Sequence, residues 1–140
     1  MKKIVVILLF LGITISYAQV ENIPQNVKNT FSQKFPSITD VSWFMGDNDE
    51  WVAEFEKENR EYAVNFYKEG NWKETVYSIR FSEIPSQIRA TLRKESPGYR
   101  LEDASISETE QNKVYNFQLQ KGEDEVELVI SFDNKVLQKK

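Results

Sequence analysis

The sequence predicts an α+β protein made of two tandem repeats, each a helix followed by four antiparallel strands. Two segments, residues 23–36 and 84–97, have nearly the same helical pattern, and each begins with Ile-Pro and ends with Pro. The stretches that follow them alternate apolar and polar residues with the period of two that is typical of strands. Short turns join these stretches, so the order of elements favours a helix packed on an antiparallel meander over a parallel βαβ sheet.

The N-terminal residues 1–18 have the pattern of a signal peptide. Lys2 and Lys3 precede an apolar run over residues 4–15, and Ser16-Tyr17-Ala18 supplies small residues for cleavage between Ala18 and Gln19. An uncleaved anchor is the alternative, but the run is shorter than the roughly 20 residues of a membrane span. No Cys follows the run, which excludes a lipoprotein anchor. We therefore predict a periplasmic or secreted protein whose mature chain has no transmembrane segment.

The two halves of the remaining chain align with each other. In the helices an offset of 61 residues pairs Ile23 with Ile84, Pro24 with Pro85, Val27 with Ile88, Phe31 with Leu92 and Pro36 with Pro97. In the strands an offset of 64 residues pairs Trp51 with Tyr115, Phe55 with Leu119, Tyr62 with Val126 and Phe66 with Ile130. These matches predict one repeat over residues 19–82 and a second over residues 83–140, packed into one compact unit.

Each repeat should begin with a short helix. Ile23, Val27 and Phe31 are spaced by four residues and form one narrow apolar stripe, as do the matching residues of the second copy. Pro24 and Pro85 are expected in the first helical turn, where a missing N–H costs nothing. The prolines at the other ends stop the helices. Because such short helices are marginal alone, we expect each to lie on a sheet.

Eight strands are expected between the turns. Alternation and turn residues place them at residues 40–44, 51–56, 62–66, 72–79, 102–107, 113–120, 125–132 and 135–138. The turns contain Gly70, Gly122 and Asp133-Asn134.

Four sequence patterns of the first half resemble one family. They are I-P-x-x-V-x-x-x-F-x-x-x-F-P at residues 23–36, D-V-S-W at 40–43, W-V-A-E-F-E at 51–56 and Y-A-V-N-F-Y-K-E-G-N-W-K-E-T at 62–75. The chain resembles the secreted PepSY-like proteins of Bacteroidetes, also described as β-lactamase-inhibitor-like, over residues 21–138. The second copy departs from the pattern, with Ile106 in place of Trp43 and Val136 in place of Trp72.

This resemblance implies a tandem fold with helices packed on antiparallel sheet, like that of the β-lactamase inhibitor protein. It implies an exported, non-catalytic module that binds or inhibits another molecule. It names no target, and it carries over no site residue because the family has no catalytic motif.

Composition excludes several classes of site. The 140 residues include no His and no Cys, so Ser-His-Asp, Cys-His and thiolate-zinc sites cannot form. No Gly-rich phosphate loop is present. The formal net charge of −4 argues against nucleic acid as a partner. The local basic cluster of Arg89, Arg93, Lys94 and Arg100 is interpreted as a solvated helix face. We expect no enzyme activity, no cofactor and no metal.

Three groups of acidic residues are candidate sites. Glu54 and Glu56 project from one side of a strand and would form an acid/base pair only in a shielded pocket, whereas we expect them to face water. Residues 47–50 carry carboxylates that could bind calcium but lack the pattern of a calcium-binding loop, so an ordinary polar turn is preferred. The same interpretation applies to residues 123–125.

Aromatic residues are concentrated between residues 43 and 81. The alternating pattern assigns Trp51, Phe55, Tyr62 and Phe66 to the core. The candidate partner-binding face is formed by Phe44, Tyr67, Trp72 and Tyr77. Phe44 and Tyr67 occupy positions that alternate with the core residues of their strands, so they should point away from the core. Trp72 and Tyr77 point to opposite faces of one strand, so that one of them should face outward. Exposed aromatics among charges suit protein binding, although scattered surface aromatics, or burial of these rings under the other repeat, are the alternatives.

Three functions remain open on the sequence. The first is an exported protein-binding or inhibitor-like module of the cell envelope, with a protein partner in the envelope or outside the cell. The second is a carrier with a small apolar ligand between helix and sheet. The third is a structural component of the envelope.

Overall fold

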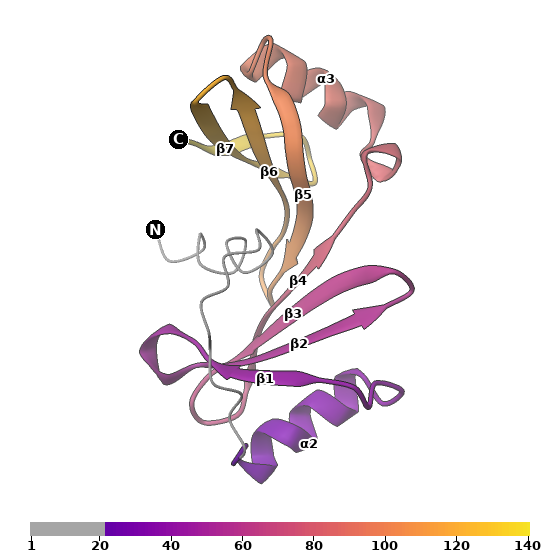
Figure 1. Ribbon diagram of the computed structural model, residues 1–140, viewed down its shortest axis with the longest axis vertical. Helices are drawn as coiled ribbons and strands as arrows, with labels where there is room; N and C mark the ends of the chain where they lie inside the picture. Colours follow the sequence, from indigo (N-terminus) through magenta and orange to yellow (C-terminus); the bar gives the residue numbers. More distant parts are fainter. Residues whose placement is uncertain (1–21) are drawn as a thin grey trace. The chain divides into compact units, whose positions relative to one another are not determined.

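The computed structural model describes residues 22–140, so the predicted signal peptide lies outside the described residues. The chain divides into two compact units, residues 22–76 and 77–140, which are described separately. The elements of the first unit are α2 (Gln25–Lys34), β1 (Ser42–Met45), the 3-10 turn η1 (Asp47–Asp49), β2 (Trp51–Lys57), β3 (Arg60–Phe66) and most of β4 (Trp72–Ser78). Those of the second are the end of β4, the 3-10 turn η2 (Phe81–Glu83), α3 (Ser86–Glu95), β5 (Arg100–Glu108), β6 (Lys113–Lys121), β7 (Asp124–Ser131) and β8 (Val136–Lys139) (Figure 1).

The fold is α+β, with two helices and an eight-stranded antiparallel sheet among the described residues. The strands lie in the sheet in chain order from β1 to β8, so each pairs with its neighbours in sequence. Tight turns allow this order: Glu58 and Asn59, for example, both have positive φ and join β2 to β3 as a two-residue hairpin. The eight predicted strands are confirmed, and each of their ends lies within two residues of the observed end. No helix in the described part of the chain is long and apolar enough to cross a membrane.

The two helices begin and end in the same way. Pro24 and Pro85 have extended ψ angles of 142° and 146° and immediately precede α2 and α3, so they cap the helices and do not lie in the first turn as expected. Their carbonyls accept the first helical bonds, from the N–H groups of Lys28 and Arg89. The helices end at Lys34 and Glu95, two residues before the predicted stops at Pro36 and Pro97, because a residue before proline avoids helical geometry.

The core of the first unit is aromatic and includes the apolar stripe of α2. Val27 is fully buried and Phe31 is 4% exposed, and they join the predicted core residues Trp51, Phe55 and Phe66, with Tyr62 packed against them. The ring centroid of Phe31 lies 5.4 Å from that of Trp43, 5.5 Å from Phe55 and 6.4 Å from Phe66, in edge-to-face arrangements. The register explains the grouping: Trp51 pairs with Phe66 and Phe55 pairs with Tyr62, so these side chains share one face of the strands.

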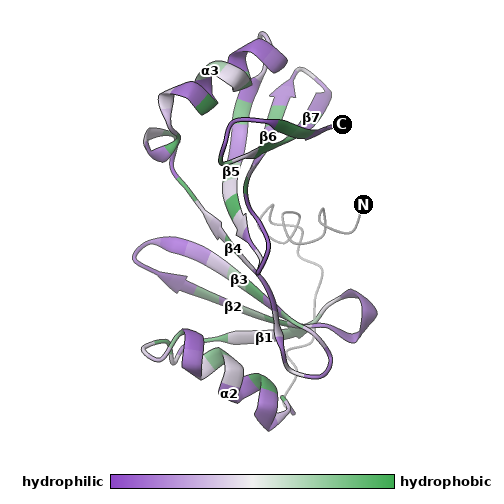
Figure 2. Ribbon diagram, turned by 180° about the vertical axis from the view of Figure 1, so that it is seen from behind, coloured by the Kyte–Doolittle hydropathy of each residue, from purple (hydrophilic) through white to green (hydrophobic). Residues whose placement is uncertain are grey.

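The core of the second unit uses smaller apolar residues. The stripe of α3, formed by Ile84, Ile88 and Leu92, belongs to the same buried cluster as Phe117, Leu128 and Ile130 of the strands. Phe117 pairs with Leu128 across β6 and β7, and both are fully buried. Figure 2 shows that both helices carry hydrophilic as well as hydrophobic surface, as expected of helices that bury one stripe.

A hydrogen bond also connects a turn of the first unit to the helix α2. The side-chain amide of Asn26 in α2 donates a hydrogen bond to the carbonyl of Glu69, in the turn after β3. The next residue, Gly70, has a φ of +100°, which L side chains rarely adopt. A Cβ added at Gly70 would lie only 2.6 Å from Nδ2 of Asn26. The turn therefore needs glycine for its backbone and for the close approach of the helix.

We expect Gly70→Ala to destabilise the protein more than Gly122→Ala. Gly122 also has a positive φ, of +61°, but a Cβ there would meet nothing within 4 Å. Gly122→Ala should therefore cost only the backbone penalty of about 1–2 kcal/mol, whereas Gly70→Ala adds the collision with Asn26. Urea unfolding followed by circular dichroism measures both losses. Equal losses would contradict the role assigned to the contact between the helix and the turn.

Candidate functional site

The structure does not bring the four candidate aromatics together on one open face. Phe44 is half-buried in β1, where it pairs with Val52 on the side opposite Trp43. Tyr67 follows β3 and is 46% exposed. Trp72 packs against the core of the first unit, and Tyr77 packs against the core of the second. Only Tyr67 is therefore an exposed aromatic of the kind expected.

The expectation that either Trp72 or Tyr77 faces outward is not met. It assumed that β4 has one buried side, whereas β4 supplies one aromatic to each unit's core. Trp72 is further covered by the ammonium of Lys34, which lies 3.7 Å from its ring centroid, and its indole N–H donates a 2.9 Å hydrogen bond to the Thr75 hydroxyl. Trp72 is thus held in place by the fold.

Tyr77 is one of several groups that contact Lys113. The Lys113 ammonium lies 6.0 Å from the ring centroid of Tyr77 and 5.3 Å from that of Phe132, and 3.7 Å from a carboxylate oxygen of Glu108. Burial acts to lower the pKa of Lys113, but Tyr77 and Glu108 together outweigh it and raise that pKa. Lys113 therefore stays charged, and Tyr77 is engaged within its own unit.

Tyr67 is positioned by its backbone and by a neighbouring ion pair. Its N–H donates to the carbonyl of Asn71 and its carbonyl accepts from the N–H of Gly70, both at 2.8 Å, which fixes the turn that carries the ring. The ammonium of Lys73 lies 5.8 Å from the ring centroid and 2.6 Å from Oε1 of Glu50. We refer to Glu50, Tyr67 and Lys73 as the Tyr67 patch. It presents an exposed aromatic ring beside a partly buried ion pair.

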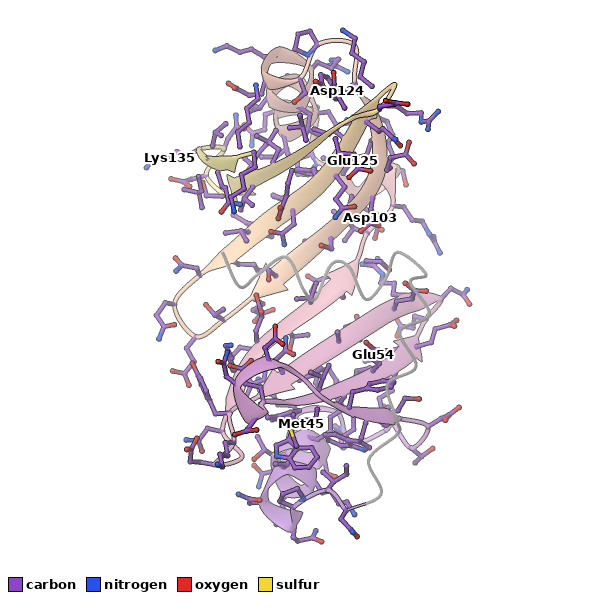
Figure 3. All side chains as sticks on the ribbon, turned by 60° about the vertical axis from the view of Figure 1, so that its left-hand side comes forward. Met45, Glu54, Asp103, Asp124, Glu125 and Lys135 are labelled. Atoms are coloured by element: carbon purple, nitrogen blue, oxygen red, sulfur yellow. The ribbon has the colours of Figure 1, made fainter. Side chains whose placement is uncertain are left out.

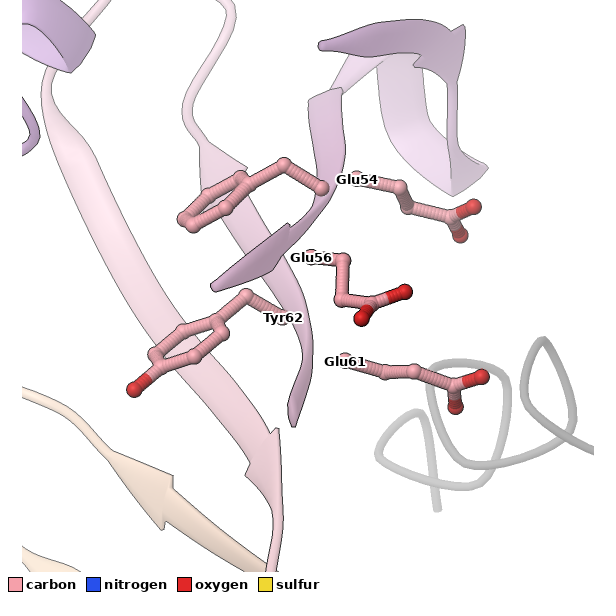
Figure 4. Close-up of a pocket in the computed structure, with 5 residues that line it drawn as sticks. Glu54, Glu56, Glu61 and Tyr62 are labelled. Carbon is pink, nitrogen blue, oxygen red and sulfur yellow. The ribbon is translucent and has the colours of Figure 1, made fainter. Parts of the chain in front are cut away.

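Three carboxylates gather on the side of the same hairpin that faces away from the aromatic core. Glu56 pairs directly with Glu61 across β2 and β3, and Glu54 is two residues before Glu56. Figure 4 shows the three side chains pointing the same way, with Tyr62 on the other side. They line part of a shallow depression of about 260 Å³. The sequence identified Glu54 and Glu56 but missed Glu61, which the two-residue turn at Glu58 and Asn59 brings opposite them.

Glu54 is the carboxylate that departs from expectation. It was expected to face water, yet it is half-buried, and its Oε1 atom is buried without a hydrogen-bond partner. Burial and then the nearby charge of Glu61 raise the pKa of Glu54 above its ordinary value. A carboxyl with a raised pKa can hold a proton, but acid/base chemistry needs a second group with an opposed shift.

Two of the three acidic residues in the turn at residues 47–50 form ion pairs. Asp49 lies 3.7 Å from the ammonium of Lys68, and Glu50 pairs with Lys73. Within residues 22–140 no cluster of three or more carboxylate, His or Cys side chains has the arrangement of a metal site.

We expect Glu54→Gln to stabilise the protein at pH 7, and the gain to shrink as the pH falls. The pKa of Glu54 is higher in the folded protein than in the unfolded chain, so the ionised carboxylate destabilises the fold at a pH above the folded pKa. This penalty disappears once the pH is below the ordinary pKa of 4.5, because the carboxyl is then protonated in both states. The free energy of unfolding of both proteins, measured by urea titration between pH 4 and 8, tests this. Glu56→Gln, at the exposed neighbouring position, controls for the loss of one charge. A gain at Glu54 that does not vary with pH would contradict the assignment.

One family model matches the chain. It is described as "Putative beta-lactamase-inhibitor-like, PepSY-like", and it matches residues 49–138, which include β2 to β7 and all but the last residue of β8. No curated protein shows significant similarity to the chain.

Several solved structures from Bacteroides have a similar fold. A BLIP-like protein from Bacteroides fragilis has a TM-score of 0.74 and 21% identity, with 86% of this chain and 88% of that chain covered. A DUF2874 family protein from Bacteroides uniformis has a TM-score of 0.79 and 13% identity, covering 85% of this chain and 89% of that one. A protein from Bacteroides eggerthii described as a putative periplasmic protein has a TM-score of 0.77 and 14% identity, covering 85% and 88%. At these identities the likeness concerns the fold.

Proposed function

The chain belongs to the PepSY-like family, and we propose that it is an exported, non-catalytic module that binds a protein of the cell envelope or the cell exterior through the Tyr67 patch. The family description and the fold shared with a BLIP-like protein suggest an inhibitor-like or binding module. The observation that carries the proposal is the exposed ring of Tyr67, held by its turn beside the Lys73–Glu50 ion pair. A fixed aromatic ring with a charged rim gives large contact area at small entropic cost.

A binding function fits the available chemistry better than catalysis does. The chain has no His and no Cys. Glu54, Glu56 and Glu61 lie together, but within residues 22–140 no group of three or more such side chains is arranged to hold a metal ion. Packing in the first unit argues against the carrier alternative, because the ring of Phe31 is buried between α2 and the strands and lies next to three aromatic rings of the strands. A purely structural role would leave the exposure of Tyr67 without use.

We further propose that the chain arose by duplication of one α-β-β-β-β element, with repeats at residues 19–82 and 83–140. Matched details support this. The capping residues Pro24 and Pro85 have similar ψ angles, 142° and 146°, which the proline ring does not fix. The hydroxyls of Thr30 and Thr91, 61 positions apart, each donate to the carbonyl four residues earlier. The second copy has Ile106 in place of Trp43 and Val136 in place of Trp72. Both tryptophans pack against the first core, whereas Val136 is 39% exposed, so the repeats differ in their cores and on their surfaces.

Export is proposed from the N-terminal pattern and is testable by itself. We expect expression with residues 1–18 intact to yield a protein in the periplasm or the medium that starts at Gln19. Intact-mass spectrometry of the protein from each fraction measures the cleavage site. An Ala18→Arg variant, which blocks the small-residue requirement, should retain the signal peptide. A wild-type protein that keeps residues 1–18 in every fraction would contradict export by this route.

The binding proposal is tested by removing the Tyr67 ring. Tagged wild-type protein and Tyr67→Ala are used to capture proteins from periplasmic and culture fractions of a Bacteroidetes host, and the captured proteins are compared by quantitative mass spectrometry. A partner that contacts the ring should bind Tyr67→Ala about tenfold more weakly, as expected when a contact aromatic is truncated. Because Tyr67 is outside both buried cores, the circular dichroism spectrum should stay unchanged.

Phe81→Ala is the matched control, since Phe81 is another exposed aromatic, at 56%, and lies outside the Tyr67 patch. Partners lost with Tyr67→Ala and kept with Phe81→Ala support the proposal. Equal recovery of every captured protein by wild type and Tyr67→Ala would reject this surface. Tyr77→Ala is unsuitable as a probe, because it would also disturb the core of the second unit.

A further inference from the structure

The strand β8 is the last in the sheet, and its outer edge is open among the described residues. β8 pairs with β7, and Glu127 exchanges both backbone hydrogen bonds with Lys140 at 3.0 Å. In an antiparallel pair hydrogen-bonded positions alternate with non-bonded ones. The next pair, Leu128 with Lys139, is therefore non-bonded, and the N–H and C=O of Lys139 point to the open edge. A register shift further along leaves Leu137 without a residue opposite it on β7.

Exposed apolar side chains are concentrated at this edge. Phe132 is 43% exposed, Val136 is 39% exposed and Leu137 is 58% exposed. They continue the core of the second unit, because Val136 pairs with the fully buried Ile130, and Phe132 stacks on Tyr115 at 4.4 Å between centroids. A further strand placed here would extend the backbone ladder and the apolar core together.

The charge of β8 restricts what can pair with it. Residues 135–140 contain Lys135, Lys139 and Lys140 and no acidic residue. Lys135, labelled in Figure 3 in the turn before β8, pairs with Asp133 at 3.0 Å, and the ammonium of Lys139 contacts the Glu95 carbonyl at the end of α3. Like charges placed opposite each other destabilise a strand pair, which disfavours β8 of a second copy as the partner. Acidic side chains on an incoming strand would instead be attracted.

We infer that the open edge of β8 is a docking site for an extended protein segment with alternating acidic and apolar residues, which adds to the sheet as a ninth strand. The backbone groups of Lys139 supply part of the ladder. Val136 shares a face with Ile130 and contacts the apolar side chains of the incoming strand. Lys135 and Lys140, opposite Ser131 and Glu127, lie on the other face and attract the acidic side chains. The site lies in the second unit and does not use the Tyr67 patch, so it goes beyond the function proposed above.

The test uses a synthetic peptide as the incoming strand. Uniformly ¹⁵N-labelled protein is titrated with the capped peptide Glu-Val-Glu-Ile-Glu-Val-Glu, and amide shifts and hydrogen exchange are followed by NMR. We expect saturable shifts confined to β7 and β8, slower exchange of the Lys139 amide, and weaker binding at higher salt. The same peptide with lysines in place of the glutamates should not bind.

Two variants and one control separate the apolar and charged contributions. Val136→Asp should abolish saturable binding at the peptide concentrations that saturate wild type. Lys140→Glu should weaken binding about twofold to fivefold, the range expected of one exposed ion pair. Met45→Asp, at a residue of the opposite edge strand β1 that is as accessible as Val136, should bind the peptide like wild type.

Four outcomes would overturn the inference. The first two are the absence of shifts at β8 and equal binding of the acidic and basic peptides. The third is perturbation centred on β1. The fourth is protection of the Lys139 amide without peptide that rises with protein concentration, since this would identify a second copy of the chain as the occupant. Retained binding by Tyr67→Ala would show that the result is independent of the Tyr67 patch.

Discussion

The burial of one apolar stripe of each short helix against one face of the strands is the interaction on which the structure depends. A helix of ten residues such as α2 or α3 is marginal in water, so its stability comes from the contact with the sheet. In the first unit Phe31 makes this contact with three aromatic rings, and in the second Ile88 and Leu92 make it with Phe117 and Leu128. The strands must keep one face apolar to receive the helix, which leaves the other face and the edges for polar groups.

The candidate surfaces follow from what this packing leaves over. Glu54, Glu56 and Glu61 share the side of β2 and β3 that α2 does not cover, and Tyr67 follows the end of β3, where the chain turns away from the core. At β8 the apolar face continues to an edge that no described strand closes. The helix–sheet contact thus holds each unit together, and neither candidate surface is needed to bury a helix.

The fold was largely predictable because its signals are periodic and local. Residue spacing located both helices, all eight strands and the core residues Trp51, Phe55 and Phe66. The failures involve pairing between segments. Trp72 and Tyr77 have opposite parities, which predicts one outward ring only if β4 serves a single core, and it serves two. Glu54 was expected to face water. Its burial and the nearby charge of Glu61 instead raise its pKa, and the alternation of residues along one strand reveals neither of these effects.

The sequence by itself determined the α+β fold class and the position of each helix and strand, because these follow from spacings of two and four residues. Its composition also determined that no site can use His or Cys. The tertiary structure decided which aromatic is exposed, which carboxylates meet and which edge carries apolar side chains. Those properties depend on cross-strand register, such as Glu56 opposite Glu61 and Val136 opposite Ile130. Register joins residues that are separate in the chain, and a one-residue shift would reverse every one of these placements.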